Sequence, residues 1–275
     1  QLTPRRVEDR SRIVWQRKQK YLHHLPITFV AVTNWLVVRA KQSSLFRDNR
    51  IELIPLAIDT TVFRPFDRHV ARDLLHLPQD KKIVFFGAPS LEDPRKGIKY
   101  LLEALQKLSL LTEGTDSLLN RDEVFLLLAG CKDIGKGSLP FPSRHVGFLN
   151  DDITLALAYQ AAEIFVSPSI EDAGPMMIPE SMLCGAPVVA FNTGGAPDLI
   201  ETMKTGYLAA YKDSSDLANG MYALLSSSNL LAMRTAAREA AARRHTPSVV
   251  AKQYLDLYRL LVELPDDVNG SLQDP

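Results

Sequence analysis

Short, continuously apolar runs alternate with helical patterns along most of this 275-residue chain, and this alternation limits its fold more than any other feature. Because a continuous apolar run is buried on both faces, such runs predict strands of a parallel sheet. The intervening segments carry apolar residues at intervals of three and four, which predicts crossover helices. We therefore predict an α/β fold with a Rossmann-like, doubly wound parallel sheet. The predicted strands are 51–55, 83–87, 124–130, 163–167 and 187–191, and the predicted helices are 97–111, 154–162, 215–225, 230–244 and 248–264.

The two ends of the chain fit this alternation less simply. Residues 27–32 predict a strand and Thr33 the cap of a following helix, but no other strand is expected to pair with this one. The chain also exceeds the roughly 100 to 200 residues of one typical domain. We therefore predict that residues 1–50 are the remnant of a neighbouring domain with a linker, and that residues 51–264 form one domain. The polar tail 265–275 is predicted to be disordered.

Composition excludes several classes of protein. Lys plus Arg equals Asp plus Glu, at 32 each, so no whole-chain field draws nucleic acid, and peripheral membrane contact would depend on local patches. The most apolar segment, 27–38, falls short of the ~20 residues that span a bilayer, and no secretion signal is visible, so we predict a cytoplasmic protein. Cys131 and Cys184 are predicted to be buried thiols, and the six histidines have no metal-ligand spacing, so no metal site is predicted.

The segment 167–192 combines a strand end, an acidic Gly-Pro loop, a short helix and a new strand. Pro179 has no N–H and fits only the first turn of a helix, so the helix is expected to begin near residues 176–178 with its unpaired amides facing the loop. Phosphate suits such amides. Glu171, Asp172 and Glu180 flank the same turn, and carboxylates suit sugar hydroxyls. A nucleotide sugar supplies both groups.

A second candidate element follows the strand 83–87. Arg95 and Lys96 come just before Gly97 in a turn that leads into a helix. Ligands of open α/β sheets bind at the carboxyl ends of strands, and cations there neutralise the charge of a departing diphosphate. The alternative is a solvated Arg-Lys pair at a helix start.

Three weaker patterns remain open between two interpretations. Gly147, Phe148 and Leu149 either receive a nucleotide base through backbone atoms or form an ordinary turn, with Asp151 or Asp152 capping the next helix. The pair 194–195 either contacts phosphate or packs against a neighbouring strand. The Met pair 176–177 either shapes a sugar pocket or fills the core.

Together these motifs resemble the donor site of the family 4 retaining glycosyltransferases, which have the GT-B fold. In that family a Glu, seven residues and a second Glu follow a Pro-Ser, and a Cys-Gly-x-Pro-Val-Val segment comes next. Segments 167–169 and 184–189 match, as does Glu180. The first acid is Asp172, since Glu171 lies one residue too early. The family's Phe-Gly is replaced by Gly174-Pro175, and its Arg after the strand's Gly is Ala88.

The resemblance implies retaining transfer of a sugar from a nucleotide diphosphate sugar to a glycan or lipid-linked acceptor, without metal or cofactor, in polysaccharide or glycoconjugate biosynthesis. Glu180 would hold the ribose hydroxyls, Asp172 or Glu171 the donor sugar, and Lys96 the leaving diphosphate. The other expected donor-binding residues are Arg95, Gly147, Phe148, Leu149, Gly174, Pro175, Met176 and Met177.

The resemblance also implies a domain organisation. The chain is expected to be the donor half of a GT-B enzyme with the end of its acceptor-binding domain. Without the rest of that domain, the isolated chain is expected to be weak or inactive. The alternative is a nucleotide-binding module that does not catalyse transfer without its missing acceptor domain.

Overall fold

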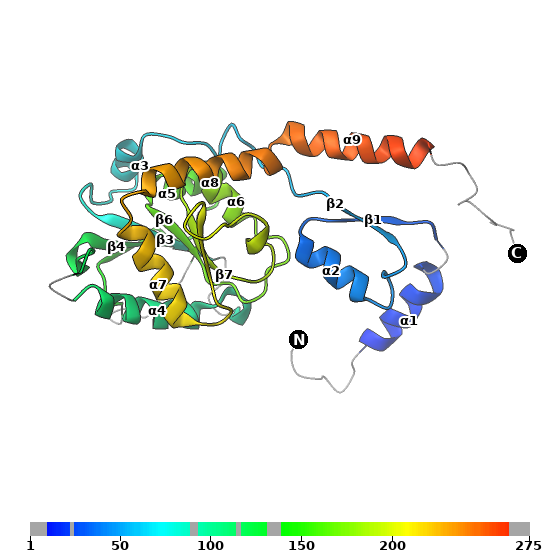
Figure 1. The fold of residues 1–275 in the computed structure, drawn as a ribbon, viewed down its shortest axis with the longest axis horizontal. Helices are drawn as coiled ribbons and strands as arrows, with labels where there is room; N and C mark the ends of the chain where they lie inside the picture. The colour runs from blue at the N-terminus through cyan, green and yellow to red at the C-terminus, as the bar shows by residue number, and fades with distance from the viewer. Residues whose placement is uncertain (1–9, 23–24, 89–92, 114–116, 131–138, 264–275) are drawn as a thin grey trace, which may run out of the picture. The chain divides into compact units, whose positions relative to one another are not determined.

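The computed structural model describes residues 10–22, 25–88, 93–113, 117–130 and 139–263, which fall into two compact units (Figure 1). The larger unit runs from Pro55 to Ala251, and the smaller unit contains the described residues outside that range. Cys131 and the predicted tail lie outside the described residues.

The smaller unit contains a strand–helix–strand arrangement. Its elements are α1 (Ser11–Leu22), β1 (Thr28–Ala31), α2 (Asn34–Gln42) and β2 (Arg50–Leu53). Thr33 caps α2 as expected, because its hydroxyl accepts from the backbone N–H of Leu36. β1 and β2 pair in parallel, with Thr28 opposite Arg50 and Ala31 opposite Leu53. The helix between them makes the crossover that a parallel pair requires.

Two sequence predictions at this place are wrong. The segment 51–55 was expected to join the larger sheet, and the strand 27–32 was expected to lack a partner. Instead they pair with each other, and β2 ends before Pro55, which has no N–H to donate to a ladder. An apolar run shows that a segment is buried, but it does not show which other segment covers its edge.

In the residues that the structure describes, the larger unit contains six parallel strands in the order β5-β4-β3-β6-β7-β8. The predicted strands of the larger sheet are confirmed as β3 (Lys82–Gly87), β4 (Val124–Ala129), β6 (Ile164–Ser167) and β7 (Val188–Phe191). Two edge strands were not predicted, β5 (Ser143–His145) and β8 (Gly206–Ala209). β5 has exposed ends and no apolar residue, so it carries no hydrophobic signal.

Helices cover both faces of this sheet, as a doubly wound fold requires (Figure 1). α4 (Ile98–Leu111) and α7 (Ser214–Leu225) pack together on one face. The other face carries α3 (Arg68–Leu74), α5 (Asp152–Ala161), α6 (Met177–Leu183) and α8 (Leu230–His245). α9 (Pro247–Glu263) follows, and three short 3-10 turns are η1 (Pro94–Lys96), η2 (Arg121–Glu123) and η3 (Ala196–Asp198).

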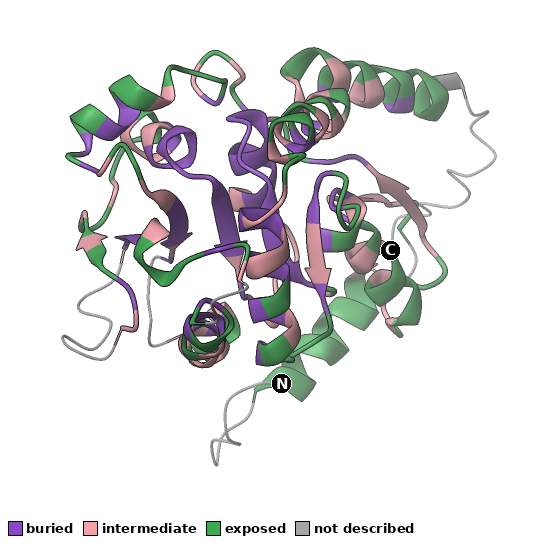
Figure 2. Cartoon of the chain, turned by 60° about the vertical axis from the view of Figure 1, so that its left-hand side comes forward, coloured by how far each residue is buried: buried purple, intermediate pink, exposed green. Residues whose placement is uncertain are grey.

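The core consists of two layers separated by the sheet. Phe85 and Phe165 point into the layer of α5 and α6, whereas their neighbours Phe86 and Val166 point into the layer of α4 and α7. The strands at the centre of the sheet are accordingly buried on both sides (Figure 2). This two-sided burial explains the continuous apolar runs in the sequence.

The order of the strands creates a crevice between β3 and β6. From β3 the chain runs outward to β4 and β5, and then returns to β6 on the opposite side of β3. Loops that leave two neighbouring strands in opposite directions open a crevice at the carboxyl ends of those strands, where ligands of open α/β sheets bind. The ends concerned are Gly87 of β3 and Ser167 of β6.

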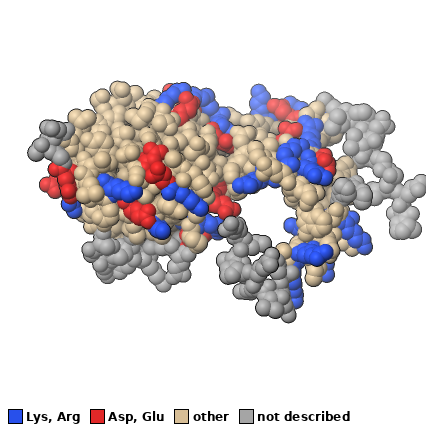
Figure 3. Space-filling view, turned by 60° about the horizontal axis from the view of Figure 1, so that its bottom comes forward, with Lys and Arg blue, Asp and Glu red and all other residues tan. Residues whose placement is uncertain are grey.

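One face of the larger unit shows no field of one sign (Figure 3). On the face drawn in Figure 3, Lys and Arg side chains are interspersed with Asp and Glu, in keeping with the balanced composition. Of the helices in the described residues, none combines the length and apolarity needed to cross a bilayer. Cys184 is buried at the end of α6, and burial raises the pKa of its thiol to about 12.

Candidate active site

A cavity of about 220 Å³ opens at the carboxyl ends of β3 and β6, where the strand order predicts a ligand site. We call it the β3–β6 cavity. It is lined by Phe86, Gly87, Ala88, Lys96, Phe165, Ser167, Pro168, Ser169, Asp172, Gly174, Pro175, Met176 and Met177. The fold therefore brings together six predicted site residues from two separate segments, namely Lys96, Asp172, Gly174, Pro175, Met176 and Met177.

Lys96 and Asp172 form an ion pair in this cavity. The ammonium nitrogen Nζ lies 3.0 Å from Oδ2, and the two side chains are 30% and 24% exposed. The other carboxylate oxygen, Oδ1, accepts from the backbone N–H of Gly174 at 3.3 Å. An ion pair in contact with water contributes only about 0 to 1 kcal/mol. Lys96 can therefore exchange Asp172 for another anion at little cost.

Two glycines fix the loop that carries Asp172. Gly97 has φ +68°, and a Cβ atom there would lie 1.8 Å from the carbonyl oxygen of Pro168. Gly194 has φ +58°, and its Cβ would lie 2.1 Å from the carbonyl oxygen of Asp172, which also accepts from the N–H of Gly195 at 3.3 Å. The loop after β6 is thus held between the turns that follow β3 and β7, and the pair 194–195 packs against a backbone.

Arg95 and Glu171 lie away from the cavity lining. Arg95 forms a two-pronged ion pair with Asp93, with a closest distance of 2.7 Å, and its side chain is 65% exposed. This hydrogen-bonded pair lowers the pKa of Asp93. Glu171 is exposed. Arg95 does not line the cavity, so it does not lie in the place of the arginine missing at Ala88, and Lys96 is the one cation among the described residues that line the cavity.

Glu180 lies in the first turn of α6 and is buried. Its Oε2 accepts from the phenol of Tyr159 at 3.2 Å. Burial is the main cause that raises the pKa of Glu180 to about 7, the charge of Asp152 adds to it, and the hydrogen bond from Tyr159 opposes it. Glu180 does not line the β3–β6 cavity itself.

The predicted base site also lies outside the cavity lining. Gly147 has φ +72°, and its carbonyl oxygen accepts from the N–H of Gly130 at 2.7 Å. Phe148 is 58% exposed and Leu149 is half-buried against the core. Asp151 caps α5 by accepting from the N–H of Thr154 at 2.8 Å. The capping interpretation is observed, and the base contact stays a prediction.

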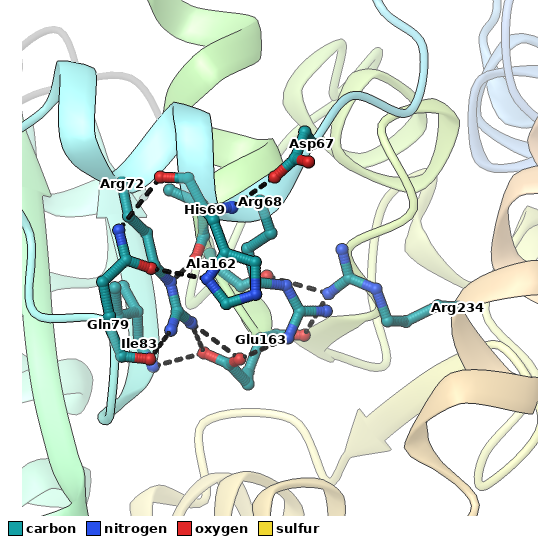
Figure 4. A network of polar contacts seen from close by, with 10 residues as sticks. Asp67, Arg68, His69, Arg72, Gln79, Ile83, Ala162, Glu163 and Arg234 are labelled. Atoms are coloured by element: carbon teal, nitrogen blue, oxygen red, sulfur yellow. Dashed lines mark hydrogen bonds and ion pairs between the residues drawn. The ribbon is translucent and has the colours of Figure 1, made fainter.

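Sequence reasoning missed a cluster of ion pairs at the amino ends of β3 and β6, which we call the Glu163 cluster (Arg68, Arg72 and Glu163; Figure 4). Glu163 and Arg72 are buried, and Arg68 is partly exposed. Both Glu163 oxygens accept from Arg72, at 2.8 and 2.7 Å, and Arg68 donates at 2.7 Å. The backbone N–H of Ile83 adds a further bond. A signal was present, because Glu163 begins a run that is otherwise buried, and a buried carboxylate requires a partner.

Comparison with known families identifies the chain's relatives. The sequence model of the family described as glycosyl transferases group 1 matches residues 80–227, more than half of the chain. The chain therefore belongs to this family of glycosyltransferases.

Two curated relatives are mycobacterial enzymes. A phosphatidyl-myo-inositol mannosyltransferase of Mycobacterium leprae is 32% identical over 187 residues, which cover 65% of this chain and 46% of the relative. A D-inositol 3-phosphate glycosyltransferase of Mycobacterium avium is 32% identical over 186 residues, covering 64% and 41%. The chain thus spans about half the length of the curated relatives that it matches.

Solved structures confirm the predicted GT-B type of fold. Sucrose-phosphate synthase of Thermosynechococcus elongatus matches with a TM-score of 0.73 and 23% identity, over 95% of this chain and 64% of that one. The Anabaena protein HepE, solved in complex with UDP and glucose, matches with a TM-score of 0.67 and 19% identity, over 90% and 66%. At these identities the likeness concerns the fold alone.

Proposed function

We propose that the protein transfers a sugar, with retention at the anomeric carbon, from a nucleotide diphosphate sugar to an acceptor, and that the larger unit binds the donor. The observation that carries this proposal is the β3–β6 cavity with its exchangeable Lys96–Asp172 pair. The cavity lies at the carboxyl ends of the two strands where the sheet order reverses, and it contains one cation opposite an acid.

Lys96 would bind the diphosphate in place of Asp172. The negative charge that builds on the leaving diphosphate then lies beside a fixed ammonium group, which stabilises the transition state. We propose that this cation serves without a metal ion. Asp172, released from Lys96, or the neighbouring Glu171 would accept hydroxyls of the donor sugar. The half-buried Met176 and Met177 would border that sugar.

Glu180 would accept the ribose hydroxyls. A carboxylate offers about four acceptor positions, and the described residues donate one hydrogen bond to this one, from Tyr159. Two ribose hydroxyls match the remaining capacity of a buried carboxylate. The base would contact Gly147, Phe148 and Leu149, as the sequence predicts.

The partner molecules follow from the same proposal. HepE, whose fold is similar, is solved with UDP and glucose, which supports a nucleotide sugar as the donor. The acceptor would be a glycan or a lipid-linked molecule, and the name of the Mycobacterium leprae relative includes a phosphatidylinositol. Such products would place the protein in polysaccharide or glycoconjugate biosynthesis, with no cofactor beyond the donor.

α1 supports contact with the cytoplasmic surface of an anionic membrane. This helix has no acidic residue, and basic helices with exposed apolar side chains lie in the membrane interface. Its basic residues are Arg12, Arg17, Lys18 and Lys20, and its exposed large apolar ones are Ile13, Val14, Trp15 and Tyr21. Co-sedimentation with phosphatidylserine vesicles tests this contact, and Arg17→Glu with Lys18→Glu should abolish it. Equal binding by that variant would remove the membrane from the proposal.

A second candidate is a nucleotide-binding module that does not catalyse transfer by itself. The observation that favours it is Ala88 in the cavity lining, at the position where the family that the sequence resembles carries an arginine, so that one cation for a leaving diphosphate is missing. Donor hydrolysis or transfer by the isolated chain would exclude this candidate, whereas binding without turnover would support it.

Calorimetric titration with UDP, GDP, ADP and their sugars tests the donor site. Lys96→Ala should weaken diphosphate binding by about 1.5 to 3 kcal/mol and leave nucleoside binding unchanged, because it removes a charged contact to phosphate. Lys99→Ala is the matched control, since Lys99 is 78% exposed and pairs with Glu103 at 3.8 Å on α4. Failure of all three nucleotides to bind, or equal weakening of nucleosides and diphosphates, would contradict the proposal.

A further inference from the structure

The side-chain carboxylate of Glu180 has one neutral hydrogen-bond donor among the described residues, the phenol of Tyr159. The phenol oxygen lies 3.2 Å from Oε2, and within the described part of the chain it is the one hydrogen-bond donor to this carboxylate. Both residues are buried, and Tyr159 has no exposed surface. In such surroundings a lost hydrogen bond is not replaced easily by water. The direction and the charge of this carboxylate therefore depend on where the phenol lies.

The ring of Tyr159 is fixed by the same strands that border the β3–β6 cavity. Its centroid lies 5.3 Å from those of Phe85 and Phe165, and both contacts are edge-to-face. Phe85 of β3 and Phe165 of β6 are neighbours in the sheet register. Such aromatic contacts restrict a ring beyond simple burial. The phenol oxygen is thus held in place by the centre of the sheet.

The helix that carries Tyr159 is held at both ends. Asp151 caps the start of α5, as described above. At its end, Arg72 donates to the carbonyl of Ala161 at 3.0 Å, and Arg234 donates to that of Ala162 at 2.9 Å (Figure 4). Guanidinium groups at a helix C-terminus satisfy its free carbonyls and suit the helix dipole. These contacts fix the rotation of α5, and with it the direction of the Tyr159 side chain.

We propose that Tyr159 is a positioning residue for donor binding: its phenol orients the Glu180 carboxylate, stabilises the charged form, and so sets the pH above which Glu180 accepts ribose hydroxyls. This inference rests on the proposed function, in which Glu180 receives the ribose. Tyr159 itself does not touch the donor in this scheme.

The other groups around Glu180 do not supply this stabilisation. Asp152 at the start of α5 raises the pKa of Glu180, as burial does. Cys184, one turn further along α6, is a neutral thiol because burial raises its pKa to about 12. Arg234 of α8, the helix packed on α6, interacts with Cys184. The hydrogen bond from Tyr159 is the interaction that lowers the Glu180 pKa.

The test compares Tyr159→Phe with the wild type in two measurements. NMR titration of the Glu180 side-chain carboxyl carbon in the ligand-free protein should show a pKa above the wild-type value of about 7. Calorimetry with UDP, GDP and ADP should show affinity about threefold to tenfold weaker near pH 7, with most of the loss recovered at pH 9, since one pKa unit is a factor of ten. Tyr222→Phe is the control, because Tyr222 lies in a different helix, α7, and its phenol oxygen accepts from the backbone N–H of Leu118 at 3.1 Å.

A second variant keeps the test decisive if Tyr159→Phe folds poorly. Asp152→Asn removes a charge that raises the Glu180 pKa, so it should lower that pKa and strengthen binding near pH 7. An unchanged Glu180 pKa in Tyr159→Phe would overturn the inference, and so would an unchanged Glu180 pKa in Asp152→Asn if Tyr159→Phe does not fold. A shifted pKa without a parallel shift in nucleotide affinity would overturn the link to binding and would count against Glu180 as the ribose ligand. A wild type that binds no nucleotide would instead refute the proposed function, while the ligand-free titration would still report on the Tyr159 contact.

Discussion

In the larger unit, a carboxylate forms ion pairs both at the amino ends of β3 and β6 and at their carboxyl ends. Comparing the two places distinguishes a structural cluster from a candidate ligand site. At the amino ends of β3 and β6, Glu163 and Arg72 are only 8% and 4% exposed, and both Glu163 oxygens are occupied. At the carboxyl ends, Asp172 and Lys96 are 24% and 30% exposed and line a cavity. A buried carboxylate with both oxygens paired has no capacity left for a ligand, whereas a partly exposed ion pair can exchange partners at little cost. Burial, more than residue type, distinguishes the two ends.

The largest loss of stability is expected from a change at the amino ends of β3 and β6. Glu163→Gln should destabilise the larger unit by about 3 to 5 kcal/mol, because it leaves the buried guanidinium group of Arg72, and the partly exposed one of Arg68, without a carboxylate. Urea unfolding measures this change. The matched variant at the carboxyl ends, Asp172→Asn, should cost less than about 1 kcal/mol. Similar losses in the two variants would remove the distinction between the two ends.

The next largest effect is a pH-dependent change in folding stability caused by Glu180. Its pKa is raised from 4.5 to about 7, so the folded protein holds this proton more tightly than the unfolded chain does. The stability from this group is fully present below pH 4.5 and is lost as the pH rises through about 7. Glu180→Gln does not titrate and should gain up to roughly 3 kcal/mol over the wild type at pH 8, while it loses nucleotide affinity.

Denaturant unfolding from pH 4 to 8 measures this gain. Glu239→Gln is the control, since Glu239 is 63% exposed and its replacement leaves the buried carboxylate of Glu180 in place. If Glu180→Gln is no more stable than the wild type at pH 8, burial of the charged Glu180 carboxylate does not destabilise the folded protein.

A smaller effect tests the loop that carries Asp172. Gly97→Ala should cost about 1 to 3 kcal/mol more than Gly147→Ala and should weaken diphosphate binding. Both glycines have positive φ, but a Cβ at Gly97 meets the carbonyl of Pro168, whereas a Cβ at Gly147 meets nothing within 4 Å. Thermal unfolding and calorimetry measure the two effects. Equal costs at the two positions would show that the close approach of the loops does not stabilise the site.

The smallest effect is expected for Arg95→Ala. Arg95 is exposed and pairs with Asp93, so the variant should change stability by less than about 0.5 kcal/mol and leave diphosphate affinity unchanged. The comparison with Lys96→Ala in the same titration is direct, because the two residues are neighbours in η1. A loss of affinity as large as that of Lys96→Ala would mean that Arg95 moves into the cavity and replaces the arginine missing at Ala88.

Much of the sheet and part of the site were predictable from the sequence, for a common physical reason. β3 and β6 are buried on both faces and therefore appear as continuous apolar runs. Lys96 and Asp172, which the sequence motifs assign to one donor site, each follow such a strand, and parallel strands place their carboxyl ends on one edge, which explains why the two residues lie close together.

Other features depend on which segments meet, and periodicity does not contain that information. β2 pairs with β1 across a helix, and the short polar β5 has no apolar signal. The contact of Tyr159 with Glu180 depends on the rotation of α5, and the partners of Glu163 come from α3, about 90 residues earlier in the chain. These contacts become visible only when the packing of the helices on the sheet is known.

NMR of the methionine methyl groups tests whether a nucleotide diphosphate binds in the β3–β6 cavity. The chain has six methionines. Met176 and Met177 line the cavity, Met233 is buried in α8, and Met203 is 48% exposed near β8. On titration with UDP, GDP and ADP, we expect at least one nucleotide to shift the signals of Met176 and Met177. The signals of Met203 and Met233 should stay in place, and Lys96→Ala should suppress the shifts. Nucleotide binding that leaves the signals of Met176 and Met177 unchanged would show that the nucleotide does not bind in this cavity.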